Sequence, residues 1–530
     1  MTISENKIKI GFLISNKNHI SFFYSKLIEK ILVDDRYIVE FVFLESDQVA
    51  KKPTNSSIIL SLIVKLEKKL FKVKNYPNSY VSIANLLKDK AVTSVRNISK
   101  SPYVRLNDED LNTLRSKNFD LLYRIGWGII KGDVLNIAKH GIWSLHHGDY
   151  QHFRGKPAVF WEVYKGLSHA GCVLQKLTNK LDDGQVIDSL NTSINVFSYS
   201  TSLSILYYKS LEMLLDNLEK LHTNKKLDFK PKGLKVYTNE LFKTPNLRIQ
   251  FVFFLKLLSR NFLRKIELKN YSWHIAIAKK EKSKEIKNYK IVPNRKGHFS
   301  ADPFIINHQG EEYVFFEEAP IKSSLGHISY IKCSDFSDRG IALKESFHLS
   351  FPNVFYHENE MYMLPETRKS NSIRLYKCLS FPDKWELASV LIDNISACDS
   401  EIFKYENKYY LFSNVSKSDY LSNADNLCIF ISENLFGPYE PHEMNPLSRD
   451  CRNSRMAGKI VQEGDDIYRL AQSGEYGYGS AIVINKLEHL SSSAYKETKT
   501  QTIYNTMLKE KGIHTFNFGE KFAVLDALIK

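Results

Sequence analysis

The stretch that decides the architecture is FIINHQGEEYVFFEEA, residues 304–319, an apolar strand, a polar turn with glycine and a second strand rich in aromatic residues. The pattern returns as VFYHENEMYMLPET from residue 354, IFKYENKYYLFSN from residue 402 and IVQEGDDIYRLAQ from residue 460, and more weakly as IHTFNFGEKFAVLDA from residue 513. Copies begin about 50 residues apart, the period of a four-stranded propeller blade. We therefore predict a five-bladed β-propeller over residues 285–530; the alternative is an unrelated series of hairpins.

The N-terminal part of the chain alternates apolar strands with helical segments. KIKIGFLIS at residues 7–15, YIVEFVFLE at 37–45 and FDLLYRIGWGII at 119–130 are typical of buried strands. This order predicts an open, mostly parallel α/β sheet over residues 1–195. Residues 196–284 have helical spacing and are expected to form a helical connector. The expected fold class is thus multidomain, α/β followed by all-β.

Composition limits the class of protein. A chain of 530 residues with 43% hydrophobic and 25% charged residues is globular and long enough for two or more domains. Its six cysteines form no CxxC pair, so neither a zinc knuckle nor a disulfide scaffold is indicated, and we expect no metal. Without a secretory signal or a long apolar run, the chain is expected to be cytoplasmic. A net charge of +15 favours anionic partners.

One loop of the N-terminal domain concentrates side chains that can carry chemistry. GIWSLHHGDYQHFRG, from Gly141, places His146, His147, Asp149 and Arg154 after a buried strand, where open α/β sheets bind ligands. About 30 residues on, LDDG supplies Asp182 and Gly184. A histidine beside a carboxylate can transfer protons. The alternative is that both segments are surface turns.

The combination of His146, Arg154-Gly155 and Leu181-Asp182-Asp183-Gly184 resembles the 10-formyltetrahydrofolate-dependent formyltransferases over roughly residues 7–190. The resemblance implies that 10-formyltetrahydrofolate is the cofactor, that His146 is catalytic and that Asp182 completes the site. Substrate contacts are then expected from His147, Asp149, Arg154 and Gly184. Ser144 stands where this family has an asparagine, so one amide donor is missing from the predicted catalytic group. Losing such a donor typically costs about 10²–10³ in rate.

A second candidate site is expected around the channel of the propeller, where the innermost strands begin. Its predicted members are polar residues near the starts of blades or the ends of their second strands: Asp302, Glu318, Glu366, Asp399, Arg455 and His514. Facing carboxylates suit glycoside chemistry, but they also bind sugar hydroxyls or a cation, or cap strands. Through ADPF, SRMAGKI and GIHTF, this half resembles the N-terminal domain of plant glucosamine inositolphosphorylceramide transferases, and more distantly arabinanase-type propellers, which implies carbohydrate handling.

Three functions fit these observations. In the first, the protein transfers a formyl group from 10-formyltetrahydrofolate to the amine of a nucleotide-linked amino sugar in surface polysaccharide biosynthesis, while the propeller recognises a glycan and no nucleic acid is bound. In the second, the propeller is a glycan-acting enzyme and the formyltransferase-like domain is degenerate. In the third, the chain is a glycan-binding scaffold without catalysis.

The segment 247–268 is predicted to be an amphipathic helix. Phe251, Phe254, Leu255, Leu258 and Phe262 share one face, and Lys256, Arg260 and Arg264 form a basic stripe on another. One interpretation packs the apolar face between the domains and leaves the basic stripe in solvent. The other is a peripheral contact with an anionic membrane.

Overall fold

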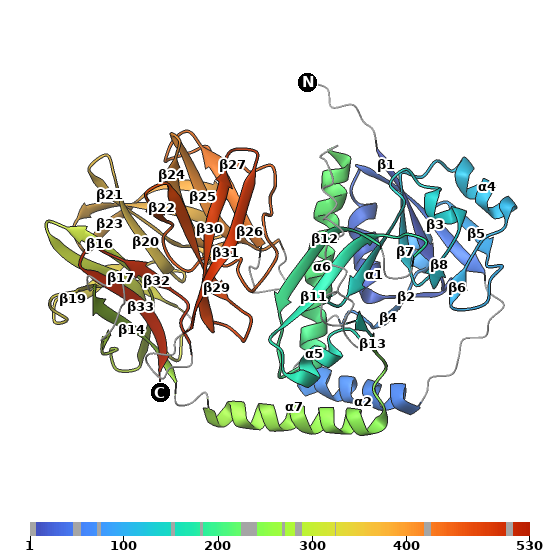
Figure 1. Ribbon diagram of the computed structural model, residues 1–530, viewed down its shortest axis with the longest axis horizontal. Helices are drawn as coiled ribbons and strands as arrows, with labels where there is room; N and C mark the ends of the chain where they lie inside the picture. Colours follow the sequence, from blue (N-terminus) through green and yellow to red (C-terminus); the bar gives the residue numbers. More distant parts are fainter. Residues whose placement is uncertain are drawn as a thin grey trace. The chain divides into compact units, whose positions relative to one another are not determined.

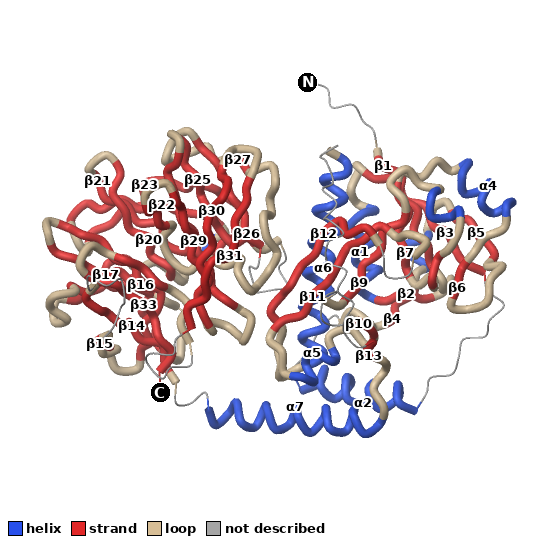
Figure 2. The backbone as a smooth tube through the Cα atoms, viewed as in Figure 1, coloured by secondary structure: helices blue, strands red, loops and turns tan. Residues whose placement is uncertain are grey.

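The computed structural model describes residues 7–45, 55–70, 76–149, 154–180, 184–223, 241–267, 271–280, 289–323, 325–417, 426–504 and 512–529. The chain forms two compact units, Met1–Arg260 and Asn261–Lys530. Helices gather in the first unit, and the second is built almost entirely of strands (Figure 2).

A seven-stranded mixed sheet forms the centre of the first unit, with the strand order β12-β11-β9-β7-β1-β3-β5. The strands are β1 (Ile8–Ile14), β3 (Tyr37–Glu45), β5 (Val92–Arg96), β7 (Leu121–Ile125), β9 (Ile142–His147), β11 (His169–Lys176) and β12 (Gln185–Ser193). Neighbours from β5 to β9 pair in parallel, whereas β11 and β12 join antiparallel. The parallel strands are apolar runs because both of their faces are buried. The predicted open, mostly parallel α/β sheet is confirmed.

Helices cover both faces of this sheet (Figure 1). One face packs against α1 and α6 through residues such as Leu27 and Leu206, and the other packs against α4 through Leu111 and Leu114. The helices are α1 (Phe22–Leu32), α2 (Asn55–Leu70), α3 (Ala84–Leu87), α4 (Asp108–Ser116), the 3-10 helix η1 (Asp133–Asn136), α5 (Phe160–Lys165), α6 (Tyr199–His222) and α7 (Leu247–Glu267). Short strand pairs link the loops: β2 (His19–Ser21) with β4 (Tyr80–Ser82), β6 (Tyr103–Val104) with β8 (Ile129–Ile130), and β10 (Arg154–Gly155) with β13 (Leu241–Phe242).

The second unit is a propeller of five four-stranded sheets, as predicted. The first two blades are β16 (His298–His308), β17 (Glu311–Pro320), β18 (His327–Lys332) and β19 (Arg339–Leu343), then β20 (Ser350–His357), β21 (Glu360–Glu366), β22 (Ser372–Ser380) and β23 (Lys384–Asp393), with the 3-10 helix η3 (Arg368–Ser370). The next two are β24 (Ala397–Tyr405), β25 (Lys408–Val415), β26 (Asn426–Ser432) and β27 (Glu440–Pro441), then β28 (Val461–Glu463), β29 (Asp466–Ser473), β30 (Ala481–Leu490) and β31 (Tyr495–Tyr504).

The fifth blade joins segments from the two ends of the unit. Its order is β15-β14-β33-β32, where β14 is Ser272–Lys279, β15 is Lys290–Ile291, β32 is Phe516–Phe518 and β33 is Phe522–Ile529. Ser272 pairs with Ile529 and Lys279 with Phe522. The strand β14 therefore belongs to the propeller, although it lies before residue 285, where the repeat predicted that the propeller begins.

Three blades share one irregularity in their innermost strand. Asp302, Phe351 and Asp399 have φ angles of 53°, 45° and 51°, and each lies where the strand register shifts. Such left-handed backbone is rare in residues other than glycine, and it is found disproportionately at functional sites. In blades one and three, the residue in this position is an aspartate.

The predicted connector 196–284 is divided between the two units. Helix α6 packs on β11 and β12 of the first unit, β14 belongs to the propeller, and α7 runs across the boundary. Lys256 and Arg260 of α7 donate hydrogen bonds to the carbonyl of Tyr164, so the interpretation of a solvated basic stripe is wrong for these two residues. In the part of the chain that the structure describes, no helix is long and apolar enough to cross a membrane.

Candidate functional site

Ser144 and His146 project from the same face of β9, because strand residues two apart point the same way. Arg124 of the neighbouring parallel strand β7 lies on this face as well, and its Nε donates a hydrogen bond to the Oγ of Ser144 at 3.1 Å. Its Nη1 donates to the carbonyl of Gly128 at 3.0 Å. The guanidinium is thus held at the carboxyl end of the parallel strands, beside the predicted catalytic strand.

The strand β11 brings the second motif to the same place. Gln175 is directly opposite Ser144 in the antiparallel pair, so their side chains share a face. A Cβ atom added to Gly184 would lie 2.7 Å from the Oε1 of Gln175, so the residue that closes the LDDG motif is next to this group. Asp182 lies outside the described residues, and its predicted approach to His146 stays a prediction.

His147 occupies a different environment from its neighbour. Its ring stacks on Tyr207 of α6, with centroids 3.8 Å apart and planes 2° apart, and its Nε2 lies 2.9 Å from the Oγ of Ser210. Burial lowers the pKa of His147 to about 3, with a smaller contribution from His146. His147 is therefore neutral at physiological pH and packs against α6, on the face of the sheet opposite to Ser144.

Two further carboxylates lie beyond the end of β9. Asp149 is buried, and Glu162 of α5 is buried beside a small cavity that is lined also by His147, Gly148 and Trp161. Burial raises the pKa of Glu162 to about 7, and the charge of Asp149 adds to the shift. The backbone of Arg154, in β10, pairs with Leu241 of β13.

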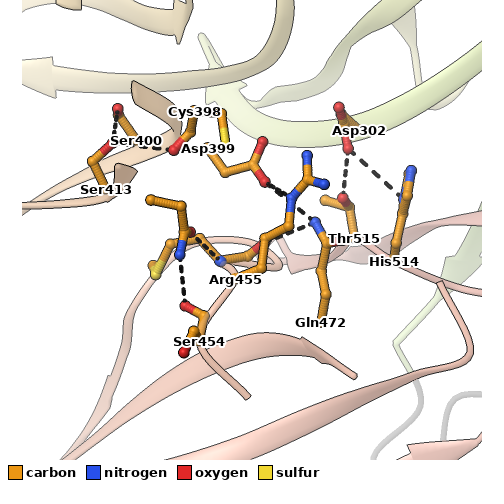
Figure 3. Close-up of polar contacts among 12 residues, drawn as sticks. Asp302, Cys398, Asp399, Ser400, Ser413, Ser454, Arg455, Gln472, His514 and Thr515 are labelled. Atoms are coloured by element: carbon orange, nitrogen blue, oxygen red, sulfur yellow. Dashed lines mark hydrogen bonds and ion pairs between the residues drawn. The ribbon is translucent and has the colours of Figure 1, made fainter. Parts of the chain in front are cut away.

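Two of the predicted propeller residues, Asp302 and Asp399, lie near the starts of the innermost strands β16 and β24. Asp399 forms an ion pair with the Nε of Arg455, and Gln472 donates to the same carboxylate oxygen at 3.4 Å (Figure 3). Glu366, at the end of β21, lies beside Asp399: one side-chain oxygen of each and the Sγ of Cys398 lie within 4.8 Å of one another. Three predicted residues from three blades thus meet in one group.

Asp302 and His514 form the adjacent part of this site (Figure 3). The Oδ1 of Asp302 accepts a hydrogen bond from Thr515 at 2.7 Å and lies 3.8 Å from the Nδ1 of His514. That nitrogen also contacts Asp526 of β33. Asp526 accepts in addition from the backbone N–H groups of Asp302, His514 and Thr515, so it fixes the first and fifth blades together.

Burial and mutual repulsion change the protonation of these carboxyl groups. Burial, together with the charge of Asp399, raises the pKa of Glu366 to about 8. Burial likewise raises the pKa of Asp302 to about 6, although His514 opposes the shift. The pKa of Glu317 is raised well above its ordinary value by burial and by Asp302. At neutral pH the site therefore combines protonated carboxyl groups with ionised ones, the combination that general acid–base chemistry requires.

Glu318 is the predicted residue that lies apart from this group. Its carboxylate is enclosed by Arg295 at 3.1 Å, Arg339 at 3.3 Å and Ser329 at 2.7 Å. Because successive strand residues point to opposite faces, its neighbour Glu317 faces the other carboxylates instead. The site residues predicted from the sequence did not include Glu317, Asp526 or Arg124. Because successive residues of a strand face opposite sides, the sequence contained a signal that could have pointed to Glu317. It contained no such signal for Asp526 or Arg124.

Comparisons with known proteins also separate the second unit, the propeller, from the first unit. Residues 289–528 match the family described as glucosamine inositolphosphorylceramide transferase 1, N-terminal. The protein of that name from Oryza sativa subsp. japonica is 33% identical over 238 residues, which cover 43% of this chain and 31% of the relative. Methionyl-tRNA formyltransferase from Prochlorococcus marinus (strain MIT 9215) is 28% identical over 191 residues, which cover 34% of this chain and 57% of the relative.

The chain joins a formyltransferase-like unit to this type of propeller. Its matches span about a third of the plant transferase (31%) and little more than half of the formyltransferase (57%). Among solved structures, a sugar N-formyltransferase from Shewanella is 13% identical over 47% of this chain and 88% of its own, with a TM-score of 0.30. A family 117 glycoside hydrolase from Zobellia galactanivorans is 12% identical over 44% of this chain and 85% of its own, with a TM-score of 0.32.

Proposed function

We propose that the first unit transfers a formyl group from 10-formyltetrahydrofolate to the amine of an amino sugar that serves surface polysaccharide assembly. The observation that carries this proposal is the convergence of Arg124, Ser144 and His146 with Gln175 at the carboxyl end of the parallel strands. The similarity to methionyl-tRNA formyltransferase supports the reaction class.

The donor groups at this place fit a formyl carrier. A formyl oxygen needs hydrogen-bond donors, and the group offers the guanidinium of Arg124 and the imidazole of His146. When bound, 10-formyltetrahydrofolate would supply an activated formyl group. Arg124, with His146 and Gln175, would hold that end of the carrier.

The residues of the chain then have separate tasks. Arg124 is fixed by Ser144 and the carbonyl of Gly128, so its positive charge is oriented before any charge develops on the formyl oxygen. This charge would take over the role of the side-chain amide of the asparagine that Ser144 replaces. His146 would donate to the formyl oxygen together with Arg124, as the amine attacks the formyl carbon.

An amino sugar is the acceptor that best suits the second unit. Glucosamine, which appears in the name of the curated relatives of the propeller, carries a primary amine that can be formylated. A net charge of +15 also suits the phosphates of a nucleotide-linked sugar.

Mass spectrometry tests the proposal directly. Nucleotide-linked amino sugars are incubated with the full chain and 10-formyltetrahydrofolate, and one of them should gain a formyl mass that is absent with the His146→Ala variant. Titration of the full chain with the folate should show saturable binding. Failure of the folate to bind would overturn the proposal.

A second activity, in the propeller, is favoured by Glu366, whose pKa is raised to about 8, beside Asp399, which forms an ion pair with Arg455. A protonated carboxyl group can donate to a glycosidic oxygen, and a second carboxylate can activate water or act as a nucleophile. Asp302 is the candidate for this second role. Turnover of chromogenic aryl glycosides that is lost in the Asp302→Asn variant would support this activity, whereas glycan binding without turnover would leave the propeller a recognition module.

A further inference from the structure

Helix α7 exposes an unbroken apolar stripe. Leu247, Phe251, Leu255, Leu258 and Phe262 recur every three or four residues and are 48–66% exposed. Recurrence at this spacing places them along one side of the helix. The helix therefore presents large apolar side chains outward along most of its length.

The opposite side of α7 is fixed to the first unit. Phe253 and Leu257 are buried in its core, and Phe253 packs on Phe160 with ring centroids 4.5 Å apart. Lys256 donates to the carbonyl of Tyr164 at 3.2 Å, and Arg260 donates to the same carbonyl at 3.3 Å. These contacts prevent the helix from turning its apolar stripe inward.

Helix α2 repeats this arrangement. Ile58, Leu62, Leu66 and Leu70 follow one another at intervals of four residues and are 45–65% exposed. Lys65 and Lys69 are exposed on the same side of this helix. Its other side is turned to the core through Leu60 and Val64.

Both helices are attached at the N-terminal end of α6. Glu67 of α2 accepts hydrogen bonds from the backbone N–H groups of Tyr199 and Ser200, at 2.6 and 2.7 Å. The ring of the same Tyr199 contacts Phe253 of α7, with centroids 6.1 Å apart. Helices α2 and α7 are therefore both attached at the same end of α6; the α7 stripe lies in the first unit except for Phe262, which follows its last residue, Arg260.

The charged side chains next to the stripes indicate what the stripes bind. Among the described side chains of α2 and α7, the only acidic one is Glu67, which is buried in the cap of α6, whereas Lys65, Lys69 and Arg248 are exposed. A symmetric contact with a second copy would bring equal charges together, because each copy contributes the same patch. Anionic headgroups complement these cations, and acyl chains accept the apolar side chains.

We propose that α2 and α7 lie in the interface of an anionic membrane, with the stripes Ile58–Leu62–Leu66–Leu70 and Leu247–Phe251–Leu255–Leu258–Phe262 inserted among the lipids. Both helices would lie along the surface, because neither is apolar on all sides.

Co-sedimentation of the full chain with vesicles is the test. Vesicles of phosphatidylglycerol and phosphatidylcholine should retain the protein at low salt and release part of it at high salt, and pure phosphatidylcholine should retain less. The variants Phe251→Glu/Leu258→Glu and Leu62→Glu/Leu66→Glu should each bind more than tenfold more weakly. Replacing Lys65 and Lys69 by serine should cost about fivefold per lysine, on the anionic vesicles alone.

A matched variant separates membrane insertion from general effects of added charge. Leu379 and Leu387 of the propeller have similar exposure, 60% and 46%, so Leu379→Glu/Leu387→Glu should bind vesicles like the unmodified protein. Absence of binding at low salt, or equal losses in the control variant, would overturn the proposal. Light scattering that finds a dimer in the unmodified protein and a monomer in Phe251→Glu/Leu258→Glu would also overturn it, and would assign the stripes to a second copy.

Discussion

The Nε of Arg124 donates to the Oγ of Ser144 across two parallel strands, at 3.1 Å. A guanidinium bonded in this way and to the carbonyl of Gly128 cannot rotate freely, so a permanent positive charge is fixed beside Ser144. If the first unit transfers a formyl group as proposed, Arg124 would supply a charged donor in place of the amide that Ser144 lacks.

We expect Arg124→Ala to lower the kcat of formyl transfer by about 10²–10³, because the charge that stabilises the formyl oxygen is removed. Arg115→Ala is the matched control, since Arg115 lies on α4 of the same unit and is 49% exposed. It should leave kcat unchanged. Equal activity of Arg124→Ala and the unmodified enzyme would show that Arg124 has no part in the chemistry.

The adjacent histidines should separate activity from stability. His146→Ala should abolish formyl transfer and unfold at an unchanged denaturant concentration. His147→Ala removes the stack on Tyr207 and the contact with Ser210, and should lower the free energy of unfolding by about 1–3 kcal/mol. Denaturant titrations and rate measurements on both variants distinguish an effect on stability from an effect on activity. If His147→Ala abolished activity and His146→Ala lowered stability, the catalytic assignment of His146 would be wrong.

Glycan turnover in the propeller should be greatest between about pH 6 and about pH 8. Below this range Asp302, with a pKa of about 6, becomes protonated and loses its basic role; above it Glu366, with a pKa of about 8, loses the proton that it donates. Glu366→Gln should remove most of the activity. Glu360→Gln, at the exposed start of the same strand, should leave the pH profile of kcat/KM unaltered. A profile that is flat from pH 5 to 9 would contradict both assignments.

Acid should destabilise the first unit through His147. Its pKa is lowered to about 3 in the folded protein, from an ordinary value near 6.5, so the unfolded chain binds the proton more tightly. The resulting contribution to stability is complete above about pH 6.5 and is lost as the pH falls towards 3. Calorimetry of the unmodified protein and of His147→Phe should show a smaller loss in the variant between pH 6.5 and pH 4. Identical losses would exclude His147 as the source.

The propeller was predictable because each blade repeats a turn between two strands in continuous sequence. The site was predictable in part, since Asp302 and Asp399 occupy equal positions in their blades. Asp526 was not, because its partners, the backbone N–H groups of Asp302 and His514, come together only when the first and fifth blades meet.

In the first unit, the strands followed from their apolar runs, but Arg124 did not stand out as functional. The sequence around a single arginine in an apolar strand does not show whether that arginine belongs to a functional site or simply lies where the strand ends at the edge of the sheet. Its meaning depends on the parallel pairing of β7 with β9, which sets it beside Ser144. The orientation of α7 could not be predicted either, because it depends on residues far away in the sequence. Hydrogen bonds to Tyr164 decide which face of the helix turns inward.

The pairing of Ser272 with Ile529 also governs the order of events during synthesis. The strand β14 leaves the ribosome before the four central blades, yet its partner β33 is made only after all of them. At about 5–20 residues per second, β14 waits on the order of 10–50 seconds with its hydrogen-bonding edge unpaired. The seven strands of the first unit's sheet, β1 to β12, pair with one another within residues 8–193, so this sheet can form while the propeller is still being translated. Chaperone demand should therefore fall on the ring-closing step, and a ribosome that stalls before β33 would release a folded first unit attached to an open ring.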